Sequence, residues 1–174
     1  MSASEETRRT WIALGLAEVL FAVTYPVCAW LALAVPSTDT RDGWADLALF
    51  AMLLVVGVFA VLVGLPMGVH TMGRLTARWV QGRSSLYASS AHLIVGLGMG
   101  TAVAVTMIRL AQVEPAAAVI VFAVPLGVVG VGTNLLMPLA VNHAWVRIAA
   151  WVLGAMPVVV AVSLLASWGM RSAN

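Results

Sequence analysis

One acidic side chain stands well inside a long apolar stretch of the sequence. Glu18 lies seven residues beyond Trp11, where the first apolar segment begins. With a helical rise of 1.5 Å per residue, this spacing places Glu18 roughly 10 Å into that segment. A charge at such a depth in a membrane costs at least about 2.5–3.5 kcal/mol, so it is normally paired, neutralised or used for function. Glu18 is therefore the first candidate for chemistry.

Two other polar side chains are predicted at nearly the same depth. His92 lies about six residues into the third apolar segment, and Asn134 lies about seven residues before the fourth one ends. If the helices that carry them face each other, Glu18 can pair with His92 and accept a hydrogen bond from Asn134. Thr133 and Ser89 could join them. The sequence therefore predicts an intramembrane polar cluster of Glu18, His92 and Asn134.

Three interpretations of these residues stay open. In the first, they are polar contacts between helices, which contribute only about 0.6 kcal/mol each on average, or Glu18 is simply neutral. In the second, a Glu–His pair titrates near neutral pH and relays protons or binds a cationic solute. In the third, the segment boundaries differ by a few residues and no cluster forms.

The remaining reactive side chains indicate neither a cofactor nor a metal. His70 and His143 fall at predicted membrane edges, and His92 has no second histidine inside a segment to share a haem. Cys28 is the one cysteine, so an internal disulfide and a cysteine-based metal motif are excluded. We expect it to be a small packing residue.

Motifs of known catalytic chemistry are also missing. The sequence has no G-x-S-x-G, no H-E-x-x-H and no Asp-rich diphosphate motif, and it contains no lysine. No catalytic residue is assigned, and we expect the protein not to be an enzyme.

The composition determines the environment in which these residues work. Of the 174 residues, 62% are hydrophobic and 9% are charged, and the mean hydropathy is +1.02. Soluble domains average about 25% charged residues, and one this small could not hide so much apolar surface. The lipid bilayer is therefore the expected solvent. The net charge of +2 comes from arginines at segment ends, so nucleic acid is not an expected partner.

The predicted fold is all-α, a single transmembrane domain over residues 1–174. The apolar segments are too long and too uniformly apolar for barrel strands, which alternate over about ten residues. Five membrane-spanning helices are expected over residues 11–35, 45–68, 86–108, 116–141 and 146–168. The alternative has four, because Thr7–Ile12 loosely resembles a twin-arginine export signal and Ala32–Ala34 a cleavage site.

Arginine placement predicts the orientation. With the N-terminus inside, six of the nine arginines are cytoplasmic, and the reverse orientation leaves three there. The positive-inside rule thus favours a cytoplasmic N-terminus and, after five spans, an extracytoplasmic C-terminus. A composition rich in Ala, Val, Leu and Arg without Lys indicates a GC-rich bacterial genome, hence the plasma membrane. The six arginines are Arg8, Arg9, Arg74, Arg78, Arg83 and Arg147.

Glycine spacing indicates close helix packing. Gly64 and Gly68 form a small-xxx-small pair in the second segment, and Gly96 and Gly100 form another in the third. Internal packing is the favoured use and a subunit interface the alternative. The segment 71–81 is mildly amphipathic, and is either an interfacial helix or an extension of the second span.

Three function classes follow. The first is an accessory, assembly or regulatory subunit of a larger membrane complex, because the chain has little soluble mass and few chemical groups. The second is a small proton-linked transporter or channel that uses the polar cluster, with a homo-oligomer as one form of it. The third is an intramembrane enzyme. An odd number of spans without an internal repeat argues mildly against an inverted-repeat transporter, which ranks the first class slightly above the second.

Overall fold

The computed structural model describes residues 3–33 and 43–172, and these form five helical rods. The first is α1 (Ala3–Leu33), the third is α5 (Ser85–Ala111) and the fifth is α8 (Ala144–Ser172). The second rod runs through α2 (Gly43–Phe59), η1 (Ala60–Gly64), α3 (Leu65–Gly68), η2 (Val69–Gly73) and α4 (Arg74–Trp79). The fourth rod runs through α6 (Pro115–Ala118), η3 (Val119–Ala123) and α7 (Val124–Asn142).

Four of the rods contain helices long and apolar enough to cross a membrane. They extend over Ser4–Ala32, Ala51–Trp79, Ser85–Ala111 and Pro115–Asn142, each with 27 to 29 residues. At 1.5 Å per residue such helices are about 40 Å long, against a hydrocarbon core of about 30 Å. The all-α prediction is confirmed for the described residues, and the four helices are long and apolar enough for a multi-pass membrane protein. A fifth span through α8, whose apolar helix is described over Ala144–Val160, stays a prediction.

Two of the three π turns in the described residues precede a proline, whereas η2 (Val69–Gly73) does not. η1 ends two residues before Pro66, and η3 ends two residues before Pro125. Proline has no N–H group, and its ring clashes with the carbonyl four residues earlier. A wider turn relieves this clash without ending the helix. The second rod therefore continues through Trp79, so most of the amphipathic segment 71–81 extends that rod rather than forming a separate helix.

Short connections with capped ends join the later rods. The Ser84 hydroxyl accepts a hydrogen bond of 3.3 Å from the Tyr87 backbone N–H at the start of α5. Gln112, with φ of 51°, ends α5 in the left-handed conformation. Glu114 then accepts a hydrogen bond of 2.7 Å from the Ala117 N–H and caps α6. These caps satisfy backbone groups that a helix end leaves unpaired.

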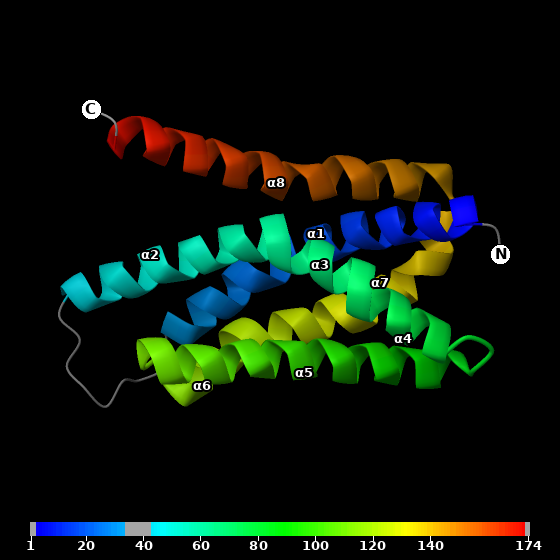
Figure 1. The fold of residues 1–174 in the computed structure, drawn as a ribbon, viewed down its shortest axis with the longest axis horizontal. Coiled ribbons are helices and arrows are strands. Elements are labelled where there is room, and N and C mark those ends of the chain that lie inside the picture. Colours follow the sequence, from blue (N-terminus) through cyan, green and yellow to red (C-terminus); the bar gives the residue numbers. More distant parts are fainter. Residues whose placement is uncertain (1–2, 34–42, 173–174) are drawn as a thin grey trace.

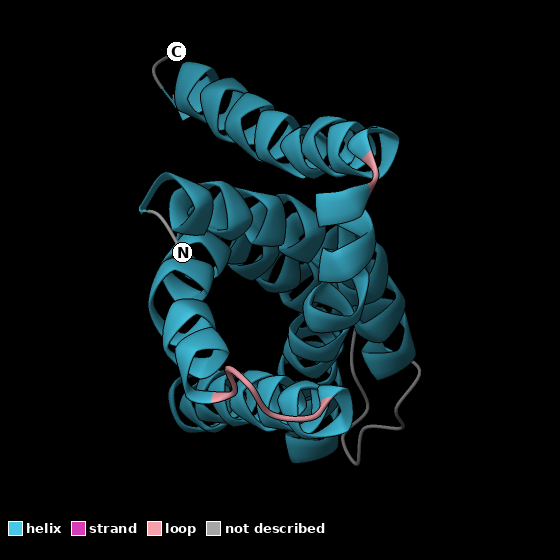
Figure 2. Ribbon diagram, turned by 90° about the vertical axis from the view of Figure 1, so that its right-hand side faces the viewer, coloured by secondary structure: helices cyan, strands magenta, loops and turns pink. Residues whose placement is uncertain are grey.

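The fourth rod forms the centre of the packing. α7 packs against α1 on one side and against α5 on the other, and α8 lies along α1 (Figures 1 and 2). The main buried cluster joins α1 to the fourth rod through residues such as Phe21, Val121 and Phe122. A smaller cluster of Ile12, Leu16, Ala140 and Ala150 joins α1, α7 and α8.

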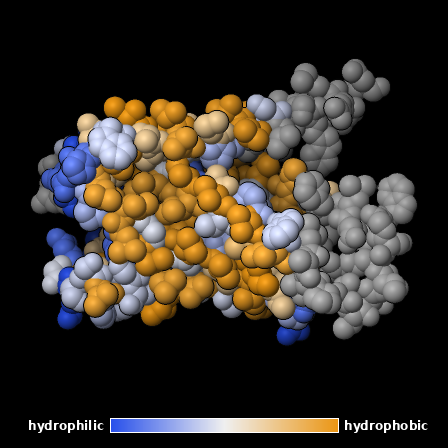
Figure 3. All heavy atoms as spheres, turned by 180° about the vertical axis from the view of Figure 1, so that it is seen from behind, coloured by the Kyte–Doolittle hydropathy of each residue, from blue (hydrophilic) through white to orange (hydrophobic). Residues whose placement is uncertain are grey.

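One end of the bundle differs from its sides. Large apolar side chains are exposed along the sides, as expected for a surface that lipid covers (Figure 3). The starts of α1, α5 and α8 and the end of α4 meet at one end (Figure 1), where the hydrophilic side chains gather in Figure 3. The six arginines expected on the cytoplasmic side belong to these four helix ends or the turn between α4 and α5.

An intramembrane cavity around Glu18

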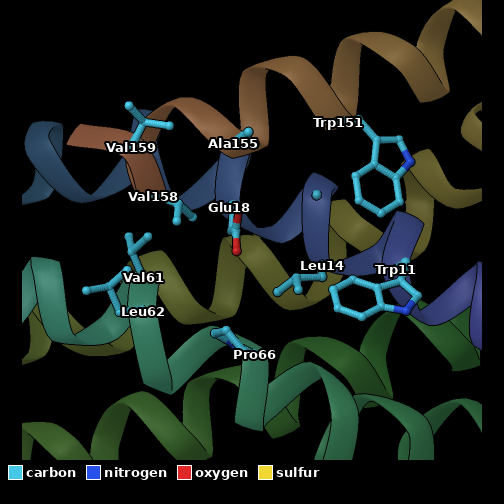
Figure 4. Close-up of a pocket in the computed structure, with 12 residues that line it drawn as sticks. Trp11, Leu14, Glu18, Val61, Leu62, Pro66, Trp151, Ala155, Val158 and Val159 are labelled. Atoms are coloured by element: carbon cyan, nitrogen blue, oxygen red, sulfur yellow. The ribbon is translucent and has the colours of Figure 1, made fainter. Parts of the chain in front are cut away.

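A partly open cavity of about 330 Å³ lies between α1, α8 and the second rod. Apolar side chains form most of its wall, and Glu18 contributes the carboxyl group (Figure 4). We call this space the Glu18 cavity. It is lined by Trp11, Leu14, Gly15, Glu18, Val61, Leu62, Pro66, Trp151, Gly154, Ala155, Val158 and Val159.

Glu18 is the polar group of this cavity. Its side chain projects from α1 into the space between α8 and the second rod (Figure 4), and the residue is only 6% exposed. Within the described part of the chain, no hydrogen bond or ion pair joins Glu18 to another residue. The residue is thus little exposed while its carboxyl faces the partly open cavity without a protein partner, an unusual position because a polar group away from water normally has one.

Helix geometry explains why these residues share one wall. Trp11, Gly15 and Glu18 recur on α1 at spacings of four and three residues, and so they lie on one face. On α8, Trp151, Gly154 and Val158 follow the same rule and line the cavity from the other side. This pattern was present in the sequence, but without a known partner for α8 it did not indicate a site.

The closest approach of α1 and α8 lies beside the carboxyl. A Cβ atom added at Gly15 would lie 3.1 Å from the carbonyl oxygen of Ala150, and one added at Gly154 would lie 2.7 Å from that of Gly15. Glycine permits this contact because it has no side chain. Gly15 and Gly154 therefore set the spacing of the two helices at the cavity, a role that sequence reasoning missed.

Aromatic rings gather at the end of the cavity near the start of α1. The Trp11 ring stacks on Trp151, with centroids 6.1 Å apart, and meets the edge of the His70 ring at 5.4 Å. Trp11 and Trp151 are 44% and 45% exposed, so they also face the surroundings of the bundle. The rings form a layer between the cavity and the polar end of the bundle.

An ion-pair cluster lies beyond the rings. The Glu6 carboxylate accepts hydrogen bonds of 2.7 and 3.2 Å from Arg74 and one of 2.7 Å from Arg78. These bonds connect the start of α1 to α4, across the helices that carry Trp11 and His70. The two arginines that the sequence placed at a membrane edge therefore tie helices together at that edge.

The other members of the predicted polar cluster have partners of their own. The Asn134 amide donates a hydrogen bond of 3.0 Å to the Ser89 hydroxyl and joins α7 to α5. The Nδ1 atom of His92 lies 2.8 Å from the carbonyl oxygen of Ala88 on its own helix. No hydrogen bond in the described residues links either side chain to Glu18.

The remaining sequence candidates lie elsewhere. Near Asn134, the Thr133 hydroxyl oxygen is buried and has no hydrogen-bond partner. Nδ1 of His70 lies 3.0 Å from the Pro66 carbonyl oxygen, His143 is exposed at the end of α7, and the Cys28 thiol is free and buried.

The two glycine pairs differ in what they contact. Gly96 packs on the backbone of Leu126 and Gly127, and Gly100 packs on the backbone of Phe122 and Ala123, so this pair lies between α5 and the fourth rod. A Cβ atom at Gly68 would lie 3.1 Å from the Met99 side chain.

At Gly64, by contrast, a Cβ atom would meet only Ala60 of the same rod, at 3.9 Å.

The cavity suits reversible binding of a positive charge. A carboxyl group in an apolar space can hold a proton or act as the counter-ion of a cation. Within the described residues, no group of three or more His, Cys, Asp or Glu side chains could hold a metal ion. No residue that lines the cavity supplies a nucleophile beside a general base. Comparison with protein-family models, curated proteins and solved structures finds no match for this chain.

Proposed function

We propose that this multi-pass membrane protein is a small proton-linked transporter, in which Glu18 binds a proton and a solute in turn. The observation that carries the proposal is Glu18 itself, a residue only 6% exposed whose carboxyl has no partner among the described residues and lines a cavity between three rods. This is the second of the three classes that the sequence predicted, with the Glu18 cavity as its site. His92 is not required, because it bonds to its own helix.

Coupling between proton and solute follows because both compete for the Glu18 carboxylate. A carboxylate left alone in an apolar cavity is unfavourable, so either a proton or a cation must neutralise it. The two cannot occupy it together, and binding of one therefore releases the other. This exclusion is the minimal requirement for exchange of a proton against a cationic solute.

The surrounding helices offer a way to open the site. The second rod contains two π turns, and Pro66 at the cavity follows the first of them. Such turns leave backbone hydrogen bonds irregular, and they are frequent at functional sites. α8 contacts α1 through Gly15 and Gly154. These residues have no side chains that would interdigitate and resist movement of one helix along the other. We propose that α8 and the second rod move about these points.

Carbodiimide labelling tests whether Glu18 exchanges a proton. Dicyclohexylcarbodiimide modifies protonated carboxyl groups in apolar surroundings, and peptide mass spectrometry identifies the site. In the full-length protein in lipid nanodiscs, we expect labelling at Glu18 that declines as the pH rises. The Glu5 side chain is 38% exposed and pairs with Arg9 at 2.9 Å, so it serves as the internal control and should stay unlabelled.

Proteoliposomes test whether this proton is coupled to transport. With an imposed pH gradient and an internal pH dye, a transported solute should dissipate the gradient in the wild type and not in Glu18→Gln. The panel consists of small cationic, neutral and anionic aromatic solutes, and Glu5→Gln is the matched control. Labelling that does not depend on pH, together with no solute effect, would overturn the proposal.

A second candidate is an accessory, assembly or regulatory subunit. It is favoured by the sparse packing of the second rod and α5. Only 17% of the most apolar stretch of each helix is buried inside the bundle. These surfaces can contact lipid or another subunit. Purification from native membranes through an N-terminal tag, followed by mass spectrometry, decides: a stoichiometric partner supports the subunit, and a lone or homo-oligomeric species favours transport.

We also propose that the N-terminus is cytoplasmic and the protein lies in the plasma membrane. The arginine-rich end of the bundle supports this orientation, because cytoplasmic loops carry the excess of arginine. Reporter fusions at the two termini test it. A reporter active only in the cytoplasm should work at the N-terminus and fail at the C-terminus, and the opposite result would invert the orientation.

A further inference from the structure

We infer that the Glu18 cavity takes a small aromatic ammonium cation, with its charged nitrogen at Glu18 and its ring against Trp11 and Trp151. This inference deepens the proposed function and rests on it, since it names the solute class for the same site. It is argued from the charge, the wall and the dimensions of the cavity.

The charge of the site selects a cation. Glu18 is the one ionisable side chain among the twelve residues that line the cavity. A carboxylate there attracts a positive nitrogen and repels a carboxylate or a phosphate. Because the described residues supply no partner, a bound ammonium group would be the first counter-charge of Glu18 rather than a replacement for an internal one.

The wall of the site selects an aromatic body. Trp11 lies two helical turns before Glu18 on α1, about 10 Å along the axis, and its ring stacks on Trp151. The two indoles present an apolar aromatic wall at one end of the cavity, and Glu18 presents the charge further along. Aromatic rings pack favourably against each other in offset or edge-to-face arrangements. A molecule with a charged head and a flat apolar end matches this separation.

The size of the site limits the ligand. A cavity of about 330 Å³ is near the lower end of the range of roughly 300–1,000 Å³ for small-molecule sites. A single ring with a short ammonium arm fits this space.

Other charged groups around the cavity do not satisfy Glu18. From the second rod, the His70 ring contacts the Trp11 ring, and Arg74 and Arg78 bond to Glu6. From the fourth rod, Glu114 caps α6; from α8, Arg147 lies at the first turn. A proton is therefore the competitor of the cation at Glu18, and binding should weaken as the pH falls.

The experiment measures binding of benzyltrimethylammonium to the full-length protein in lipid nanodiscs by equilibrium dialysis. Its neutral isostere, (2,2-dimethylpropyl)benzene, and the anion phenylacetate are the competitors. We expect the cation to bind, to be released on acidification, and to be displaced by neither competitor at matched concentration. Displacement by the neutral isostere would show that the charge plays no part, and would overturn the inference.

Variants locate the binding. Glu18→Gln should weaken binding by about tenfold or more, because the ammonium loses its counter-charge in an apolar space. Trp151→Leu should weaken it about two- to tenfold through loss of the aromatic wall. Glu5→Gln and Trp145→Leu are the matched controls, since neither residue lines the cavity, and both should bind as the wild type does.

The outcomes separate this inference from the proposed function. If the wild type does not bind benzyltrimethylammonium but Glu18 shows pH-dependent carbodiimide labelling, the ligand class is wrong and proton exchange stands. If Glu18 is not labelled, the proposed function fails with it. Trp151→Leu keeps the inference testable if Glu18→Gln does not fold, because unchanged binding in that variant would contradict the proposed placement of the ring.

Discussion

The backbone of α8 at Gly154 rests on the backbone of α1 at Gly15. A Cβ atom at Gly154 would lie 2.7 Å from the Gly15 carbonyl oxygen and 3.0 Å from its Cα atom. The contact is between two backbones, so neither side can yield as a flexible side chain would. This crossing borders the Glu18 cavity, because both glycines line it.

Gly154→Ala should therefore destabilise the protein. The added methyl group must push α8 from α1, and overpacking of this kind costs about 1–3 kcal/mol. Thermal unfolding in mild detergent measures the change. Gly64→Ala is the control: its Cβ atom would have an ordinary contact at 3.9 Å, so it should unfold as the wild type does or later. Equal melting of the two variants would contradict the close crossing.

Tyr25→Phe should lower stability by a smaller amount. The Tyr25 hydroxyl donates a hydrogen bond of 2.7 Å to the carbonyl oxygen of Leu53 and so joins α1 to α2. Removal of the hydroxyl loses this bond, which is worth about 0.5–1.5 kcal/mol. Tyr87→Phe is the matched control, because Tyr87 is exposed at the start of α5. The difference in unfolding temperature between the two variants measures the interhelical bond.

Thr133→Val should leave stability unchanged or raise it. The Thr133 hydroxyl oxygen is buried without a hydrogen-bond partner, and the substitution replaces it with a methyl group of similar shape. The comparison is Thr76→Val, which loses a hydrogen bond of 2.7 Å to the Met72 carbonyl oxygen and should cost about 0.5 kcal/mol or more. Marked destabilisation by Thr133→Val, measured in the same thermal assay, would show that the hydroxyl has a partner.

Glu6→Gln should weaken the connection between α1 and α4 in a salt-dependent manner. Glu6 pairs with Arg74 and Arg78 at 2.7 Å each, and pairs near the surface contribute little because water and salt screen them. At low salt we expect a small loss of stability, which should vanish near about 1 M salt because charges are screened there.

Glu5→Gln is the control for this effect. Glu5 pairs with Arg9 on the same helix, so its substitution leaves α1 and α4 connected. A loss of the same size in both variants would show that the interhelical pairs add nothing.

The sequence by itself determined the environment and the elements. Long apolar segments separated by polar turns form helices in lipid, because only a helix satisfies its own backbone there. Within the described residues, α1 covers the first predicted segment as far as Leu33, and the second rod continues beyond residue 68 to Trp79. It also marked Glu18, because an acid inside an apolar segment is visible without any partner.

Only the tertiary structure decided what surrounds Glu18. Depth along a helix can be counted from the sequence, but the direction in which a side chain faces depends on the neighbouring helices. Leu20 packs on Gly132 of α7, whereas Glu18 turns towards α8 and the second rod. Equal depth thus did not join Glu18 to Asn134, which bonds to Ser89. The Trp11–Trp151 stack likewise depends on two helices that are distant in sequence and meet only through packing.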